Sequence, residues 1–389
     1  MREVAIIGVG MTKFGKHEET LLEMFGDAVE EALLDAKVSP KEIEAVFFGN
    51  CLGGFEEGQM NISPFGASVL GLKDIPTTRF ECACATATVA IRYASLSVAS
   101  GCHDIVLAGG TEKTLVMGTP FATRTFAMAS DSRYEGFSGI TFPGAFAMMA
   151  MLYSKQYGIP LKTLKERMAM IAVKNHRNGA RNPKAHFRKE ITIDDVYNSM
   201  MVADPLQLYD CCPFTDGASA VIITTLEKAK KLCPKPVVVA GTGQGSAGSL
   251  LDQKDLPRLR AREVAAREAY KQAGLTPKDI DVCELHDCFT IAEIIASEGL
   301  GFFDHGKGSE AVEKGETDIG GKIPINPSGG LKARGHPIGA TGAAQVYTIV
   351  KQLRKEAGDF QVDGAKVGMV DTLGGDFSVV CNLILKRGW

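Results

Sequence analysis

Long hydrophobic runs are missing from this chain, and with them the usual signal of a membrane protein. No apolar stretch approaches the roughly 20 residues that a helix needs to cross a bilayer. The N-terminal run MREVAIIGVGM is too short for a secretory signal peptide and predicts a strand followed by a turn. The ending LKRGW does not match a peroxisomal address. These absences predict a cytoplasmic protein without membrane contacts.

An excess of charge of either sign is also missing. The chain has 43 lysines and arginines against 46 aspartates and glutamates, which gives a net charge of −3. A protein that binds nucleic acid through its phosphates usually shows a basic excess, so no nucleic-acid partner is expected. An acidic small-molecule ligand would have to be met by local basic residues.

Cysteine is not scarce, but the spacings that bind metals or form disulfide frameworks are absent. None of the ten cysteines forms a CxxC pair. The pairs Cys82/Cys84 and Cys211/Cys212 are too close together for the usual zinc-ligand spacing. We therefore expect reduced thiols and no metal site.

What is present is the alternation of short apolar strands and amphipathic helices typical of an α/β protein. At 389 residues the chain is long enough for two or three domains. A helix is expected at 21–36, and Ser39 with Glu42 reads as a capping box. Strands are expected at 4–9, 45–49, 105–108, 218–224 and 237–240. Met-rich helices at 145–157 and 164–176 interrupt this rhythm, and 228–236 reads as a linker.

An internal repeat divides the chain into two related halves. Residues 28–44 match 265–281 without a gap, at an offset of 237 (265 − 28), and this register places Cys51 opposite Cys288. A second match pairs 84–90 with 339–345. We infer two α/β halves packed face to face, with Cys84 near the loop 335–342. The alternative, a pattern common to any two helix–strand units, is weakened by the ungapped length.

The repeat suggests a division into three parts. Residues 1–115 and 203–230 form the first half, and 231–389 form the second. Residues 116–202 form an inserted loop domain.

The stretch 79–101 carries the first candidate for chemistry. It predicts a helix that is apolar nearly all round and is stopped by Gly101. Cys84 lies at the helix start, where unpaired N–H groups and the helix dipole favour a thiolate and a lowered thiol pKa. Such a cysteine suits an acyl-accepting nucleophile. The alternative is that Cys82 and Cys84 are two small core residues.

Two further clusters lie far away in the sequence. ELHDCFT contains His286 and Cys288 just past a predicted strand, and NPSGGLKARGHPIGATG brings His336 to a helix start. Taken alone, His286 reads as a strand-end histidine and Cys288 as a core thiol.

These motifs together resemble those of the thiolase superfamily over essentially the whole chain. The resemblance is seen in three segments: ECACAT around Cys84, HDCF at 286–289 and NPSGGLKARGHPIGATG at 326–342. Residues 174–187 and 203–220 add two more matches. The likeness is greatest to sterol-carrier-protein-2-type and archaeal acetoacetyl-CoA thiolases and extends to benzoylsuccinyl-CoA thiolase. It implies a duplicated five-layered αβαβα sandwich, with 116–202 covering the coenzyme A site.

The resemblance also implies a role for each candidate residue. Cys84 would form the acyl-enzyme, and His336 would take the thiol proton. Thr372-Leu-Gly374 stands where many thiolases have a CxG cysteine, so Cys288 would act at the α-carbon instead. His286, with a water and His336, would stabilise the enolate oxygen. Backbone N–H groups of Cys84 and Gly374 would hold the acyl carbonyl.

Substrates and partners follow from the same likeness. Coenzyme A is expected as substrate and product, with no bound cofactor. The chain is expected to form a homodimer or a dimer of dimers, and a separate small partner with a zinc ribbon and an OB-fold is typical of this branch. The substrate is either acetoacetyl-CoA or a bulkier aromatic β-ketoacyl-CoA such as benzoylsuccinyl-CoA. Aromatic side chains in the insertion favour the second, with Arg124 or Arg133 meeting a carboxylate.

Other interpretations remain open. The fold is also used by ketoacyl synthases and hydroxymethylglutaryl-CoA synthases, and a non-catalytic lipid carrier or scaffold subunit is a further alternative. Gly243–Gly248 fits GxGxxG, which suggests either a dinucleotide site or a turn near the pantetheine arm. The basic stretch 174–181 reads as a solvated face or as part of the coenzyme A entrance.

Overall fold

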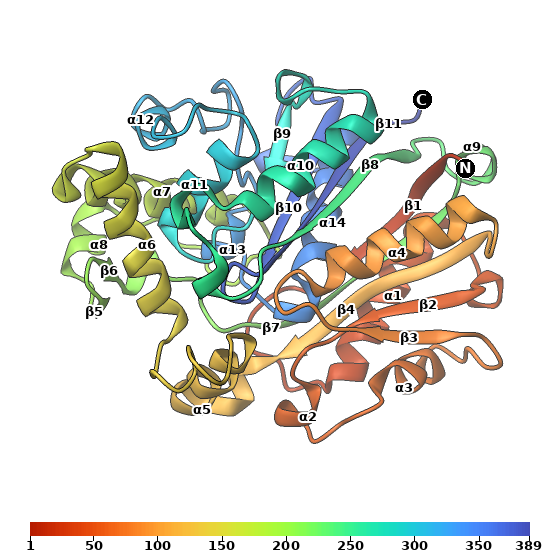
Figure 1. Ribbon diagram of the computed structural model, residues 1–389. Coiled ribbons are helices and arrows are strands. Elements are labelled where there is room, and N and C mark those ends of the chain that lie inside the picture. Colours follow the sequence, from red (N-terminus) through yellow and green to blue (C-terminus); the bar gives the residue numbers. More distant parts are fainter.

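One nine-stranded mixed sheet runs through the computed structural model, which describes all 389 residues. The strand order is β3-β2-β4-β7-β1-β8-β11-β10-β9, and Figure 1 shows β3 at one edge. The strands are β1 (Val4–Met11), β2 (Ala45–Gly49), β3 (Thr77–Phe80), β4 (Ile105–Lys113), β7 (Asp216–Thr225), β8 (Val237–Ser246), β9 (Val282–Glu284), β10 (Val367–Gly374) and β11 (Val379–Arg387).

The sheet consists of two halves that meet at a short antiparallel contact. Only two residue pairs, Ala5↔Val238 and Ile6↔Val237, join β1 to β8. Within the halves, β2 pairs in parallel with β3 and β4, and β9 pairs in parallel with β10. The remaining long pairs are antiparallel.

The internal repeat has a structural counterpart in how each half packs its outer helix. A side chain on Gly10 of β1 would lie 1.9 Å from the Ala28 carbonyl oxygen of α1 (Leu21–Ala36). A side chain on Gly243 of β8 would lie 1.9 Å from the Ala265 carbonyl oxygen of α10 (Arg260–Ala273). Because Ala28 and Ala265 are equivalent in the repeat, glycine allows the same close strand–helix approach in both halves.

Helices and sheet halves alternate as five layers, as expected for the thiolase fold. α1 and α3 (Ile62–Val69) cover one outer face, where they share an apolar core with β1, β2, β4 and β7. α4 (Thr86–Ser100) and α14 (Thr341–Arg354) lie between the two sheet halves and contact strands of both. α10 and α11 (Thr290–Gly299) cover the other outer face.

A helical segment separates β4 from β7 and gathers at one side of the molecule (Figure 1). Its longest helix, α7, packs against the short helix α13 (Gly330–Ala333), which precedes His336. The segment comprises α5 (Gly118–Phe126), α6 (Phe142–Tyr157), α7 (Leu161–Arg181), α8 (Ile193–Asn198) and a two-stranded sheet of β5 (Met201–Ala203) and β6 (Leu206–Gln207). The remaining helices are α2 (Gly53–Glu56), α9 (Leu226–Leu232) and α12 (Gly308–Glu313).

Most element predictions agree with this structure. α1 and β2 have the predicted bounds, Gly101 ends α4 in the left-handed conformation, and the Ser39–Glu42 capping box is present. Two predictions are wrong. The linker expected at 228–236 begins as the helix α9. The nearly all-round apolar character of 79–101 suggested a fully buried helix, but one side of α4 reaches the surface, where Tyr93 is 44% exposed. None of the helices has the length and apolar character needed to cross a bilayer.

Candidate active site

Cys84 lies in a tight turn that joins β3 to α4. Ala83 adopts a positive φ of 47°, which is uncommon for a residue with a side chain. The turn is held by Thr86, whose hydroxyl accepts from the Cys82 N–H at 2.9 Å and donates to the Ala83 carbonyl at 2.6 Å. This geometry leaves Cys84 partly accessible at the start of a buried helix.

His336 lies in the loop between α13 and α14, and its ring orientation is set by Thr341. Thr341 Oγ1 lies 2.6 Å from His336 Nδ1 and donates its proton to the Pro337 carbonyl at 2.8 Å. The hydroxyl therefore accepts from Nδ1–H, which leaves Nε2 unprotonated and able to take a proton. Burial and, to a smaller extent, the charge of Arg334 lower the pKa of His336 to about 3, so the ring is neutral at physiological pH.

His286 follows β9 and completes a compact group. One side-chain atom from each of Cys84, His286 and His336 lies within 4.8 Å of the others, and the two rings meet edge to face at 5.1 Å. His286 is buried, and its Nδ1 has no hydrogen-bond partner in the protein. Burial, with the nearby His336, lowers its pKa well below the usual range. Three residues that are distant in sequence thus form one thiol–imidazole cluster.

Cys288 lies beside this cluster in a short antiparallel contact. The Cys212 N–H donates to the Cys288 carbonyl at 2.9 Å, and Cys211 pairs with Phe289. Cys212 therefore lies opposite Cys288. Burial raises the pKa of Cys288 well above its usual value, with Cys212 and Cys84 among the nearby groups, so Cys288 is a neutral thiol.

The end of β10 closes the site from the other side. A side chain on Gly374 would lie 2.3 Å from the Cys82 carbonyl oxygen, so only glycine fits there. The backbone N–H that faces the Cys84 sulfur belongs to the next residue, Gly375. The N–H of Cys84 itself also lies beside the sulfur. The role of the Gly374 N–H stays a prediction.

The predicted thiolate at Cys84 is not supported. Burial raises the pKa of the Cys84 thiol to about 12, and the hydrogen bond from Gly375 offsets only part of this rise. Desolvation outweighs the helix start because Ala85 caps α4 and Cys84 lies outside its first turn. At neutral pH the resting residue is a thiol that needs a base.

Glu112, at the end of β4, connects the Cys84 side of the site to the His336 side. Its buried carboxylate accepts from the N–H groups of Cys51 at 3.0 Å and Leu52 at 2.8 Å, and from the Gly339 N–H at 2.7 Å. The Cys51 thiol in turn donates to the Ala83 carbonyl at 3.1 Å. This network fixes the relative positions of the Cys84 turn and the loop after His336.

We expect Glu112→Gln to lower the free energy of unfolding by about 2–3 kcal/mol, because buried N–H groups lose a charged acceptor. The matched control is Glu56→Gln. Burial beside Glu112 raises the pKa of Glu56 well above its usual range, so this residue is neutral and resembles an amide. Chemical unfolding monitored by circular dichroism measures both variants. Equal losses of stability in the two would contradict this assignment of charge.

Two sequence motifs differ in the structure from one of the readings given to each. Gly243 and Gly245 of the GxGxxG stretch lie within β8 and allow α10 to approach, so the motif does not follow a strand as a dinucleotide-binding turn would. Gly248 lies in the loop after β8 with a positive φ of 72°. The stretch 174–181 is not a solvated face, because Lys174 is buried and bonds to Glu293 at 2.5 Å. Asn175 donates to Asp287 at 2.8 Å, and these contacts brace the loop that precedes His336.

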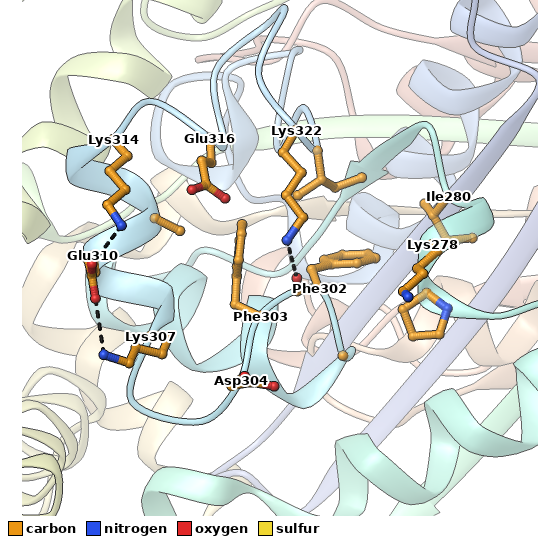
Figure 2. Close-up of a pocket in the computed structure, with 14 residues that line it drawn as sticks. Lys278, Ile280, Phe302, Phe303, Asp304, Lys307, Glu310, Lys314, Glu316 and Lys322 are labelled. Carbon is orange, nitrogen blue, oxygen red and sulfur yellow. Dashed lines mark hydrogen bonds and ion pairs between the residues drawn. The ribbon is translucent and has the colours of Figure 1, made fainter.

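A cavity of about 610 Å³ lies away from the thiol–imidazole cluster, between η7 (Pro277–Asp279) and the segment that follows α11 (Figure 2). Neither cysteines nor histidines line it. Lys307 and Lys314 bond to the same carboxylate, that of Glu310, at 3.2 and 2.6 Å. Their charges are partly neutralised, and nothing about this cavity connects it to the candidate chemistry.

Comparison with known proteins gives the same family for both halves. The N-terminal thiolase domain model matches residues 4–227, and the thiolase C-terminal domain-like model matches 243–387. The chain is 47% identical to an acetyl-CoA acetyltransferase of Methanothermobacter thermautotrophicus, with full coverage of both chains. The chain belongs to the thiolase family. This thiolase is therefore an acyltransferase, as predicted.

Two further relatives broaden the picture. The thiolase is 38% identical to the benzoylsuccinyl-CoA thiolase subunit BbsB of Thauera aromatica, over 96% of this chain and 95% of the relative. The solved structure named Ltp2-ChsH2(DUF35) aldolase superposes with a TM-score of 0.83 at 25% identity, covering 99% of this chain and 98% of that one.

Sequence reasoning missed two residues that shape the site of this thiolase. Glu112 is the next-to-last residue of β4, which begins with the apolar run Ile105–Ala108, and an acid so close to a buried strand was a usable signal. The internal repeat aligns Cys51 with Cys288, but this alignment does not indicate a role for Cys51.

Proposed function

We propose that this thiolase cleaves and forms acetoacetyl-CoA through an acetyl group carried on Cys84. The proposal is based on the Cys84–His286–His336 cluster, in which a neutral imidazole with a free Nε2 lies beside a partly buried thiol. Coenzyme A serves as substrate and product, and no bound cofactor is needed. A non-catalytic carrier or scaffold would not require this arrangement.

In the thiolysis direction, His336 Nε2 takes the Cys84 proton as the sulfur attacks the keto carbonyl. The N–H groups of Cys84 and Gly374 stabilise the resulting oxyanion, and the Gly375 N–H lies beside the attacking sulfur. The carbon–carbon bond then breaks and releases the enolate of acetyl-CoA, whose oxygen faces His286 and His336. Coenzyme A finally attacks the acetyl-Cys84 thioester and releases a second acetyl-CoA.

Cys288 supplies the proton that the enolate carbon needs. Its thiol is neutral because of burial, lies beside Cys84, and replaces the CxG cysteine that this chain lacks. In the condensation direction the same sulfur removes the α-proton once substrate binds. Cys212 is the other thiol close enough to be considered for this role.

We expect Cys288→Ala to lower thiolysis about 10²–10⁴-fold while acetylation of Cys84 by acetyl-CoA persists, because only carbon–carbon chemistry needs the α-carbon acid. Steady-state thiolysis and mass spectrometry of the acetyl-enzyme measure the two steps separately. The matched variant Cys212→Ala keeps thiolysis within about threefold. The reverse pattern would transfer the role to Cys212.

A small acyl group fits the distribution of aromatic residues better than a bulky one. Phe146 is buried and stacks on Phe289 at 4.4 Å and against Phe377 at 4.6 Å, while Phe137 is 89% exposed. The aromatic side chains of the insertion therefore do not gather into one pocket. Arg124 and Arg133 are exposed as well. The 38% identity to the benzoylsuccinyl-CoA thiolase subunit supports the aromatic substrate as the second candidate.

A thiolysis assay on a panel of β-ketoacyl-CoA thioesters tests the proposed substrate. We expect turnover of acetoacetyl-CoA at least about tenfold above that of benzoylsuccinyl-CoA, a margin of about 1.4 kcal/mol in transition-state free energy. Preference for the aromatic thioester would favour the second candidate. The panel is run with and without a candidate partner subunit.

Such a partner is proposed because two similar proteins are named as parts of assemblies, one as a subunit and one together with ChsH2(DUF35). By resemblance, the partner is a small protein with a zinc ribbon and an OB-fold. We also propose that 116–202 covers the coenzyme A site. All ten cysteines are free, which supports a reducing compartment such as the cytoplasm.

The thiolase itself is proposed to form a homodimer through β3. This strand is an edge of the sheet, and its backbone groups on one side have no neighbouring strand. Tyr93 of α4, which stacks on Phe80 at 5.6 Å, and Val69 of α3 expose apolar surface beside this edge. A two-fold axis at β3 would pair the edges and cover both side chains.

We expect Tyr93→Glu to convert the dimer to monomers at micromolar concentration, because a charge would be buried in the interface. Leu251→Glu, at a residue 72% exposed on the second half, is the matched control and keeps the dimer. Sedimentation velocity distinguishes the two species. A wild-type monomer, or equal dissociation in both variants, would contradict this interface.

A further inference from the structure

Three metal-binding side chains converge at the centre of the candidate site. One ligand atom each from Cys84, His286 and His336 lies within 4.8 Å of the others, two of these residues are buried, and Cys84 is partly so. We propose that this triad also binds Zn²⁺ in the free enzyme, as an inhibitory site that competes with acylation of Cys84. Metal binding depends on the cluster alone, whereas its inhibitory effect rests on the proposed acylation of Cys84.

The ligand types and their orientation suit zinc. A thiolate and two imidazoles form a donor set that Zn²⁺ prefers, and a water would take the fourth position. His336 already donates Nδ1–H to Thr341 at 2.6 Å, which directs Nε2 into the cluster. Metal-bound histidines are usually held in this way through their other ring nitrogen.

His286 provides an independent indication of a missing partner. Only 1% of this residue is exposed, yet its Nδ1 has no hydrogen-bond partner, and its neutral ring cannot repel a cation. An unpaired polar atom in a buried place is costly, and coordination or a ligand hydrogen bond relieves that cost. Two buried arginines lie near enough to oppose a cation, and each forms an ion pair that partly offsets its charge: Arg334 with Glu284 at 2.9 Å and Arg262 with Asp371 at 3.0 Å.

Binding requires a small closure and the release of one proton. Ligand atoms around tetrahedral Zn²⁺ are about 3.3–3.6 Å apart, given Zn–N and Zn–S distances of about 2.0–2.3 Å. Side chains now within 4.8 Å must therefore approach by about 1 Å. The Cys84 thiol loses its proton to solvent as the sulfur–zinc bond forms, and no electron is transferred. The metal-bound sulfur is then unable to attack an acyl carbonyl.

Co²⁺ is the spectroscopic probe for this site, added to purified protein without substrate. We expect one equivalent of Co²⁺ to bind per chain and to give a sulfur-to-cobalt charge-transfer band in the near ultraviolet. Added Zn²⁺ should displace the Co²⁺ and abolish the band. The band should disappear in Cys84→Ser. In His286→Gln the apparent affinity for Co²⁺ should fall at least about tenfold. It should persist in Cys288→Ser, a neighbouring thiol outside the triad, and in Cys102→Ser, an exposed one.

Inhibition provides the second measurement. Zn²⁺ should inhibit thiolysis competitively with the β-ketoacyl-CoA, and a chelator should restore the rate. Cobalt absorption that survives in Cys84→Ser, or depends on Cys102 instead, would overturn the inference. So would the absence of any cobalt–sulfur band in folded wild-type protein. Metal binding by an enzyme inactive on every thioester would leave this inference standing and remove only the proposed function.

Discussion

Replacing His336 by glutamine is expected to lower thiolysis about 10²–10⁴-fold at neutral pH and to make the remaining activity strongly pH-dependent. The reason is the state of the nucleophile. Burial raises the pKa of the Cys84 thiol to about 12, so without a base only a minute fraction is thiolate. As long as the pH is below this pKa, each increase of one pH unit raises the thiolate fraction about tenfold. The rate of the variant should rise in the same proportion.

Wild-type enzyme should not share that pH dependence. The pKa of His336 is lowered to about 3, so its ring stays neutral and able to accept the thiol proton across the neutral range. Rate profiles between about pH 6 and 9 measure both proteins. Thr341→Val is the positioning control, because it removes the acceptor that sets the His336 tautomer and keeps the ring itself. Parallel profiles for wild type and His336→Gln would show that His336 is not the base.

Replacing Cys84 by serine is expected to lower thiolysis on the order of 10³-fold or more, with no recovery at higher pH. A serine hydroxyl is a far weaker nucleophile than a thiol in the same place, and its proton is harder to remove. Initial rates with acetoacetyl-CoA and coenzyme A measure the effect. Thermal unfolding of the variant establishes that the fold is retained.

Cys82→Ser is the matched control for this experiment. Cys82 lies in the same turn and is half-buried. Its N–H donates to Thr86, and its side chain packs against apolar residues such as Val89 and Cys381. Its rate should stay within about threefold of wild type. If Cys82→Ser lost as much activity as Cys84→Ser, the turn as a whole and not the Cys84 sulfur would be required.

Local patterns in the sequence were sufficient for much of the fold. The amphipathic period of 21–36 and the glycine at 101 fix helix ends through backbone geometry that depends on few neighbours. The internal repeat indicated two related halves, and the equivalent contacts of Ala28 and Ala265 show its physical basis. The same repeat placed Cys84 near the loop that carries His336, and the two now lie together.

Properties that depend on distant neighbours were not predictable in the same way. The pKa of Cys84 was expected to fall because of the helix start, but burial by other segments raises it. Lys174 was read as solvent-facing because its neighbours are polar, whereas α7 packs against α13 and places it beside Glu293. The carboxylate of Glu112 gains its donors from two loops that are far apart in the sequence, the loop after β2 and the loop after His336, and no local pattern reveals this.

The most direct test of a shared acyl-handling site is to identify the acylated residue. Enzyme mixed with acetyl-CoA, quenched in acid and digested, should yield one peptide heavier by a single acetyl group on Cys84. The adduct should be absent in Cys84→Ser and should form much more slowly in His336→Gln. An acetyl group found on Cys288 or Cys212, or unchanged labelling in Cys84→Ser, would contradict the account.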